Sequence, residues 1–88
     1  MRNVIKAVIV AFALALSAPV VAQDFDAGME AYQRGDYTAA LSEFRPLADQ
    51  GLATAQTNLG MMYDNGEGVP MNDVKAYMWW SLAKTQGN

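Results

Sequence analysis

The sequence predicts an all-α protein built from two helix–turn–helix repeats. The main observation is a pattern of one alanine, one aromatic residue and one glycine that occurs twice, with a shift of 36 positions. Its members are Ala40, Phe44 and Gly51 in the first half, and Ala76, Trp80 and Gly87 in the second. A period of roughly 30–40 residues is typical of stacked helical hairpins. Since no segment has the pattern of a β-strand, we expect four antiparallel helices of an α/α superhelix, after an N-terminal signal helix.

The N-terminal segment has the order of parts of a secretory signal peptide. Arg2 and Lys6 supply the positive head, residues 7–16 read AVIVAFALAL, and small residues lead up to Ala22. The apolar run is about half of the ~20 residues that a membrane span needs. We therefore expect a signal peptide over residues 1–22, cleavage after Ala22, and a periplasmic or secreted product. The alternative is a retained signal anchor, which is the only membrane association that we expect.

Cleavage would leave a repeat domain over residues 23–88, with the first repeat over residues 24–51. Its first helix is expected over residues 24–34, because Phe25, Met29 and Tyr32 recur at the spacing of one helical face.

The second helix of this repeat is expected over residues 37–50. Gly35 should stop the preceding helix, and the side chain of Asp36 can accept hydrogen bonds from the free N–H groups of the new helix. An apolar stripe continues through Pro46, so we expect one helix with a kink at this proline.

The second repeat is expected over residues 52–87. Its helices should cover residues 52–63 and 73–86, with Asn72 as the cap of the last helix. Two glycines and a proline in the intervening loop, residues 64–70, exclude regular structure there.

Small residues and rings are expected to set the packing between helices. Gly28 and Gly60 interrupt otherwise good helices, so we expect each to let a neighbouring helix backbone come close. In the last helix, the residues expected to be buried are Val74, Ala76, Tyr77, Trp80 and Ala83, with Trp79 as a further candidate.

Composition argues against catalysis and against several kinds of ligand. The chain has no His and no Cys, so it lacks the usual zinc ligands, the common general base and the thiol nucleophile. Loss of Arg2 and Lys6 with a signal peptide would change the formal net charge from −3 to −5. An acidic surface repels phosphate backbones, so nucleic acid is not an expected partner. We expect no metal, no cofactor and no enzymatic activity.

Residues 55–87 resemble a Sel1-like repeat. The resemblance is carried by Ala55-Gln56, Asn58-Leu59-Gly60, Met62-Tyr63, Gly66-x-Gly68-Val69-Pro70, Asp73, Lys75-Ala76, Trp79-Trp80 and Gln86-Gly87. Residues 24–51 resemble the related tetratricopeptide repeat through Gly28, Gly35-Asp36-Tyr37, Ala40-Leu41, Phe44 and Leu47-Ala48. The resemblance implies helix pairs stacked into a right-handed superhelix, and protein–protein recognition, often by exported bacterial proteins. It implies no catalytic residues.

Two surfaces are candidates for partner binding. In arrays of this kind the inner surface is lined by the first helix of each pair, which here would present Phe25, Met29, Tyr32, Gln33, Thr57, Met61, Asp64 and Asn65. Such aromatic and methionine side chains give adaptable contact area for a peptide; alternatively, Phe25 and Met29 only close a short core. The second candidate is Trp79, which either completes the core or contributes to self-association.

The sequence therefore predicts an exported, non-catalytic interaction module that acts as an adaptor or modulator. The first alternative is a structural or oligomer-forming subunit that completes a larger helical array. A cell-wall hydrolase is a more distant alternative.

Overall fold

The computed structural model describes residues 21–87, and the side chains of residues 25–87. Within this range all regular structure is helical and consists of α2 (Val21–Gln33), α3 (Tyr37–Asp49), α4 (Ala53–Asn65) and α5 (Asp73–Gln86). The all-helical prediction is confirmed for this part of the chain. The expected signal helix lies outside the described residues.

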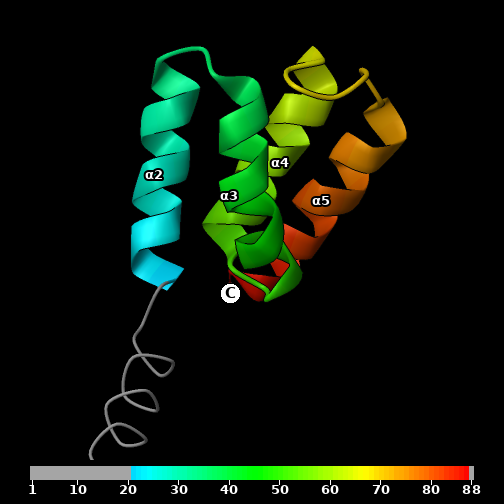
Figure 1. Cartoon of the computed structure of the whole chain (residues 1–88). Helices are drawn as coiled ribbons and strands as arrows, with labels where there is room; N and C mark the ends of the chain where they lie inside the picture. The colour runs from blue at the N-terminus through cyan, green and yellow to red at the C-terminus, as the bar shows by residue number, and fades with distance from the viewer. Residues whose placement is uncertain (1–20, 88) are drawn as a thin grey trace, which may run out of the picture.

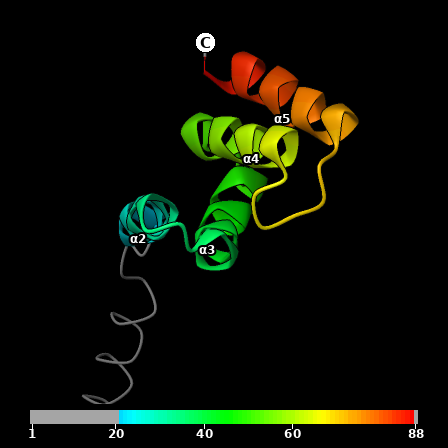
Figure 2. The same cartoon turned by 90° about the horizontal axis from the view of Figure 1, so that it is seen from above.

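The helices form two antiparallel pairs, α2 with α3 and α4 with α5 (Figure 1). Each helix packs on the next one in the sequence, so that α3 and α4 join the two pairs. Seen from above, the helices follow one another in an arc, with α2 and α5 at its two ends (Figure 2).

The second helix of each repeat starts with the expected side-chain cap. The Asp36 side chain accepts a hydrogen bond from the backbone N–H of Ala39 at 3.3 Å, and the Asn72 side chain accepts one from Lys75 at 3.0 Å. A side-chain acceptor at this position satisfies an N–H group that has no partner within its helix. The two caps lie 36 positions apart, so the sequence period is also a structural period.

Pro46 lies inside α3, and the helix continues past it to Asp49. A proline removes one backbone hydrogen bond, but this one is exposed and lies within the last turn. The helix then closes through Gln50, whose N–H donates to the carbonyl groups of Pro46 at 3.1 Å and Leu47 at 3.2 Å.

The core lies where α2, α3 and α4 meet. Its largest completely buried side chains are Phe44 and Leu47 of α3, and Leu59 and Met62 of α4. Smaller residues fill the space between them, namely Ala31, Ala40, Ala48 and Ala55. Polar contacts tie α4 to α3: the Gln56 amide donates to the Ala48 carbonyl oxygen at 3.0 Å, and Arg45 donates to the Tyr63 hydroxyl at 2.8 Å.

Gly28 and Gly60 do admit a close neighbour, but the neighbour is an aromatic ring rather than a helix backbone. A methyl group on Gly28 would lie 2.6 Å from Cε1 of Phe44. A methyl group on Gly60 would overlap the indole ring of Trp80. Each repeat therefore places the ring of its second helix on a glycine of its first helix.

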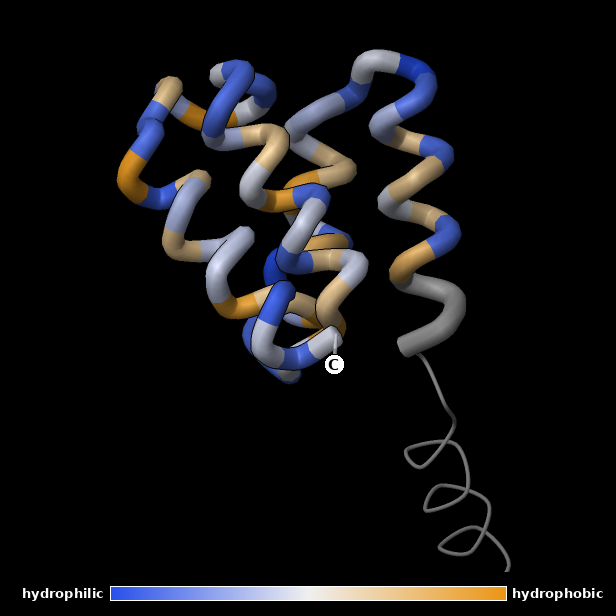
Figure 3. Tube along the Cα trace, turned by 180° about the vertical axis from the view of Figure 1, so that it is seen from behind, coloured by the Kyte–Doolittle hydropathy of each residue, from blue (hydrophilic) through white to orange (hydrophobic). Residues whose placement is uncertain are grey.

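The burial expected for α5 is only partly correct. Ala76 and Ala83 are buried against the rest of the molecule, whereas Val74 and Tyr77 are among its most exposed apolar side chains. Trp80 covers Gly60 with part of its ring and remains partly exposed. Figure 3 shows strongly hydrophobic positions along α5 as well as in the packed centre. The prediction failed at Tyr77 because α4 is the one described helix that packs closely on α5. Val74 corresponds by the period of 36 to Thr38, which is exposed although α4 packs on α3.

Candidate protein-binding groove

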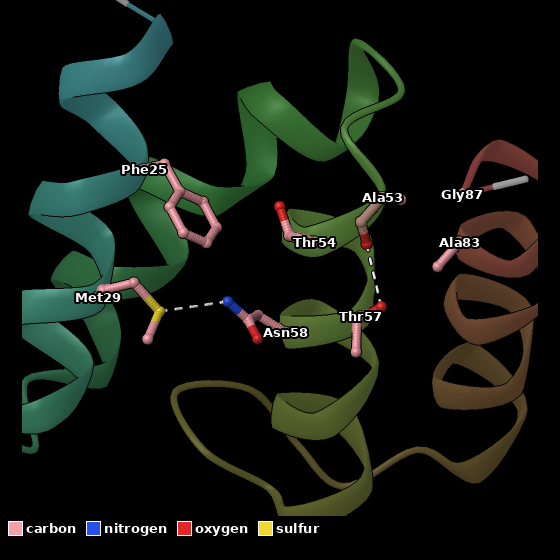
Figure 4. Close-up of a pocket in the computed structure, with 8 residues that line it drawn as sticks. All are labelled: Phe25, Met29, Ala53, Thr54, Thr57, Asn58, Ala83 and Gly87. Carbon is pink, nitrogen blue, oxygen red and sulfur yellow. Dashed lines mark hydrogen bonds between the residues drawn. The ribbon is translucent and has the colours of Figure 1, made fainter.

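A pocket of about 400 Å³ opens between α2, α4 and the end of α5 (Figure 4). Phe25 and Met29 of α2 form one wall. The other lining residues are Ala53, Thr54, Thr57 and Asn58 of α4, together with Ala83 and Gly87. None of these residues is ionisable. The pocket, which we call the groove, therefore offers apolar surface and neutral hydrogen-bonding groups.

Polar groups in the groove come from α4. The Asn58 amide nitrogen donates to the sulfur of Met29 at 3.4 Å, across the space between the two helices (Figure 4). A thioether sulfur is a weak acceptor, so a stronger acceptor on a ligand could replace it at little cost. The Thr57 hydroxyl donates to the carbonyl oxygen of Ala53 at 3.0 Å, which leaves its oxygen able to accept.

One turn beyond Met29, a second contact joins α2 to the other repeat. The Tyr32 hydroxyl donates to Oε1 of Glu67 at 2.8 Å, and Glu67 belongs to the loop between α4 and α5. The rings of Tyr32 and Tyr37 lie 5.3 Å apart beside this contact. Burial, followed by the hydrogen bond and negative charge of Glu67, raises the pKa of Tyr32 to about 12. Tyr32 therefore takes part in a contact that joins the two repeats.

The structure brings only part of the predicted inner surface together. Phe25, Met29 and Thr57 line the groove. Gln33, Met61, Asp64 and Asn65 are exposed but lie outside it. Whether any of these residues binds a partner stays a prediction.

The expected burial of Trp80 is only partly correct, and its neighbour Trp79 is the better buried of the two tryptophans. Trp79 is partly buried and packs against the main core, while Trp80 is the more exposed of the two. The Trp80 indole N–H donates to the carbonyl oxygen of Thr57 at 3.3 Å. Because Trp79 packs inward, the surface that it offers a partner is smaller than its position in the sequence suggests.

Sequence reasoning did not select Asn58, Thr54 or the small residues that complete the groove. Asn58 stood only in the Sel1-like motif, and its contact with Met29 joins residues 29 positions apart. Ala53, Ala83 and Gly87 have no functional chemistry of their own, so only the packing of α5 on α4 reveals that they line the groove. Helical spacing was the one available signal, since Thr54 lies three residues before Thr57 and four before Asn58.

Other kinds of site are not found in the described part of the chain. Residues 21–87 hold no group of three or more His, Cys, Asp or Glu side chains that could bind a metal ion. No helix within the same range has the length and apolar character that crossing a bilayer requires.

Comparisons with known proteins agree with the resemblance seen in the sequence. The Sel1 repeat family matches residues 53–88. The exopolysaccharide production negative regulator of Rhizobium leguminosarum bv. viciae is 32% identical over 89% of this chain and 34% of its own length. No solved structure gives a significant match.

Two mammalian proteins also match part of the chain. The DAP3-binding cell death enhancer 1 of Mus musculus is 45% identical over 56% of this chain, and that of Rattus norvegicus is 43% identical over 58%. The chain spans 10% of the length of each mammalian protein, so these matches concern a small part of them.

The matched residues 53–88 contain the whole of α4 and α5, together with the glycine-rich loop between them. The resemblance noted for residues 55–87 is therefore confirmed. The chain contains a Sel1 repeat, which comprises α4 and α5.

Proposed function

We propose that this protein is an exported, non-catalytic adaptor or modulator that binds a peptide segment of a protein partner in the groove. The observation that carries the proposal is the lining of that pocket. Aromatic, methionine and amide side chains converge on about 400 Å³ of space without any ionisable group. Largely apolar pockets with a few placed polar groups are the usual form of binding sites.

The lining also indicates the character of the bound segment. Phe25 and Met29 offer apolar contact to side chains, while Asn58 can both donate and accept hydrogen bonds with a peptide backbone. Without a charged group in the groove, a charged side chain placed there would be desolvated with no partner. We therefore expect the bound segment to be uncharged and its affinity to change little with salt.

Names of relatives support an interaction role without assigning a partner. One is a binding protein and another a negative regulator by name. The Sel1 repeat is a module of protein–protein interaction in the family that this chain resembles. The lack of His and Cys in the sequence supports the non-catalytic part of the proposal.

Two exposed threonines provide a matched test. Thr54 lines the groove, and Thr38 lies on α3 away from the groove. Each would be replaced by arginine in the affinity-tagged protein, and co-purifying proteins from its own cells would be identified by mass spectrometry. Thr54→Arg should remove a partner that Thr38→Arg retains, because a charged side chain would fill the groove. Retention of every partner by both variants, with unchanged helicity, would contradict the proposal.

Export is proposed from the N-terminal sequence and has its own test. Cell fractionation and mass spectrometry of the intact protein should find a product that begins at Gln23 outside the cytoplasm. A product that keeps Met1 and fractionates with the membrane would instead indicate the signal-anchor alternative.

The second candidate function, an oligomer-forming subunit, is favoured by one observation. Seven large apolar side chains are exposed among residues 25–87, and all of them except Met61 lie between Met71 and Leu82.

A further inference from the structure

An apolar ridge runs along the outer side of α5. Its members are Met71, Val74, Met78 and Leu82, which we call the outer ridge, and their exposed fractions are 67%, 79%, 44% and 40%. Val74, Met78 and Leu82 recur every four residues, so they share one side of α5, and Met71 lies just before the helix begins. The buried residues Ala76 and Ala83 lie on the opposite side. α5 is thus apolar on both sides, a pattern typical of a helix with neighbours on both sides.

The first repeat shows that a following repeat would not cover this ridge. The positions in α3 that correspond to Val74, Met78 and Leu82, by the period of 36, are Thr38, Ser42 and Pro46. All three are exposed, although α4 packs on α3. A helix placed on α5 as α4 is placed on α3 would therefore leave the outer ridge in solvent. The apolar residues of the ridge need a different partner.

We propose that the outer ridge pairs with the same ridge of a second copy, in an antiparallel arrangement with its two-fold axis at Met78. This interface is separate from the groove, since no ridge residue lines that pocket. It places Val74 of each copy opposite Leu82 of the other. Closed two-fold pairing by a single surface patch is the commonest form of protein self-association.

Charge favours this surface over the others for self-association. The chain has nine acidic and six basic residues, so two copies carry the same net negative charge and repel each other. The side of α5 that carries Val74, Met78 and Leu82 contains no carboxylate: Asp73, the one acidic residue of α5, lies about 140° around the helix from Met78. Lys75 is the nearest charge. Antiparallel pairing separates the two copies of Lys75 by about 9 Å along the helix axis. This distance is close to the Debye length, so salt screens much of the repulsion between the two lysines.

Shape and orientation are compatible with such a pair. Val74, Met78 and Leu82 form a row with a spacing of four residues. Rows of this spacing interdigitate in the commonest class of helix packing, with the axes crossing at about 50°. Antiparallel helices also place opposite ends of their dipoles near each other. One helix per copy gives an interface at the small end of the specific range, so we expect a weak dimer.

The absence of cysteine in the sequence permits a direct test by cross-linking. Met78→Cys would place two thiols at the two-fold axis, within the distance that a disulfide requires. The matched control is Ser42→Cys, the corresponding exposed position on α3. Under mild oxidation of the full-length chain, Met78→Cys should form disulfide-linked dimers at least about tenfold faster than Ser42→Cys.

A mixture of variants tests the orientation. Val74→Cys and Leu82→Cys proteins should cross-link to each other faster than either cross-links to itself, because antiparallel pairing opposes these positions. Faster cross-linking within each variant alone would indicate parallel pairing and overturn the proposed arrangement.

Sedimentation of the uncrosslinked protein completes the test. The unmodified protein and the control Ser42→Lys should show the same concentration-dependent dimer. Met78→Lys should raise the dissociation constant of the dimer by about tenfold or more, with unchanged helicity. A monomer at every concentration overturns the proposal, as does equal weakening by both substitutions. Binding of anionic lipid vesicles by a monomer, lost in Met78→Lys, would assign the ridge to a lipid surface and also overturn it.

Discussion

Phe44 in the first repeat and Trp80 in the second occupy corresponding positions, yet Phe44 is 0% exposed and Trp80 is 38% exposed. Each ring covers a glycine of the preceding helix, Gly28 or Gly60. The environments differ because α4 packs on α3, while no described helix packs on the far side of α5. The same contact between ring and glycine is therefore part of the core in one repeat and part of the edge in the other.

Removing each ring tests this difference most strongly. Phe44→Ala should lower the free energy of unfolding by about 3–5 kcal/mol, because it leaves a cavity in the core. That is about the whole stability that the core of so small a domain supplies, so we expect this variant to be unfolded. Trp80→Ala should cost about 1–2 kcal/mol, since part of its ring already lies in water. Circular dichroism should show Phe44→Ala without helical structure in the absence of urea, whereas Trp80→Ala should keep a urea transition with a lower midpoint. A folded Phe44→Ala whose loss equals that of Trp80→Ala would contradict the comparison.

Replacing each glycine by alanine tests the same contact between ring and helix. Gly28→Ala places a methyl group 2.6 Å from a ring that is enclosed on all sides, so we expect a loss of about 1–3 kcal/mol. The added methyl group in Gly60→Ala also contacts a ring, but Trp80 is partly exposed and can move toward solvent. Alanine further regains up to about 1 kcal/mol of helix propensity. The melting temperature should fall clearly for Gly28→Ala and little for Gly60→Ala; the reverse order would show that Trp80 is fixed.

The hydrogen bond from Tyr32 to Glu67 links the two repeats, and its loss should have a smaller effect. Tyr32→Phe should lower the free energy of unfolding by about 1 kcal/mol, the usual net value of such a bond. The matched control is Tyr77→Phe, whose ring is 72% exposed, and it should change stability by less than about 0.5 kcal/mol. Similar values for both variants would mean that the link between the repeats does not stabilise the fold.

The same tyrosine predicts a pH dependence. The pKa of Tyr32 is raised from 10.0 to about 12 in the folded protein, so the unfolded chain releases this proton first as pH rises. The stabilising contribution of Tyr32 should be complete below pH 10 and lost between about pH 10 and 12. Spectroscopic titration should show one late-ionising tyrosine that is absent in Tyr32→Phe. Glu67→Gln should lower the pKa of Tyr32, because it removes the negative charge.

Much of the fold followed from local pattern. The caps at Asp36 and Asn72 and the bounds of α5 were predicted, because cap chemistry and helical periodicity depend on neighbouring residues alone. The repeat of 36 positions then gave the pairing of helices, since each unit must bury its apolar face against a neighbour.

What the sequence did not predict depends on which neighbours are present. Val74 and Tyr77 fit an apolar stripe, but no described helix covers them. Asn58 and Ala83 line the groove only because α2 and α5 approach α4 from different sides. The choice between Trp79 and Trp80 as the better buried ring likewise depended on the position of α5 on α4. Local periodicity specifies a face of a helix, and tertiary packing decides what that face meets.

The most direct test of the groove as the partner site is contact mapping in the cells that make the protein. A photo-reactive phenylalanine derivative would replace Thr54 in the groove or Thr38 on the outer side of α3, two exposed positions on the same protein. We predict that irradiation cross-links a protein partner to position 54 and not to position 38. Cross-linking at position 38 alone, or at neither position while the partner still co-purifies, would contradict the account.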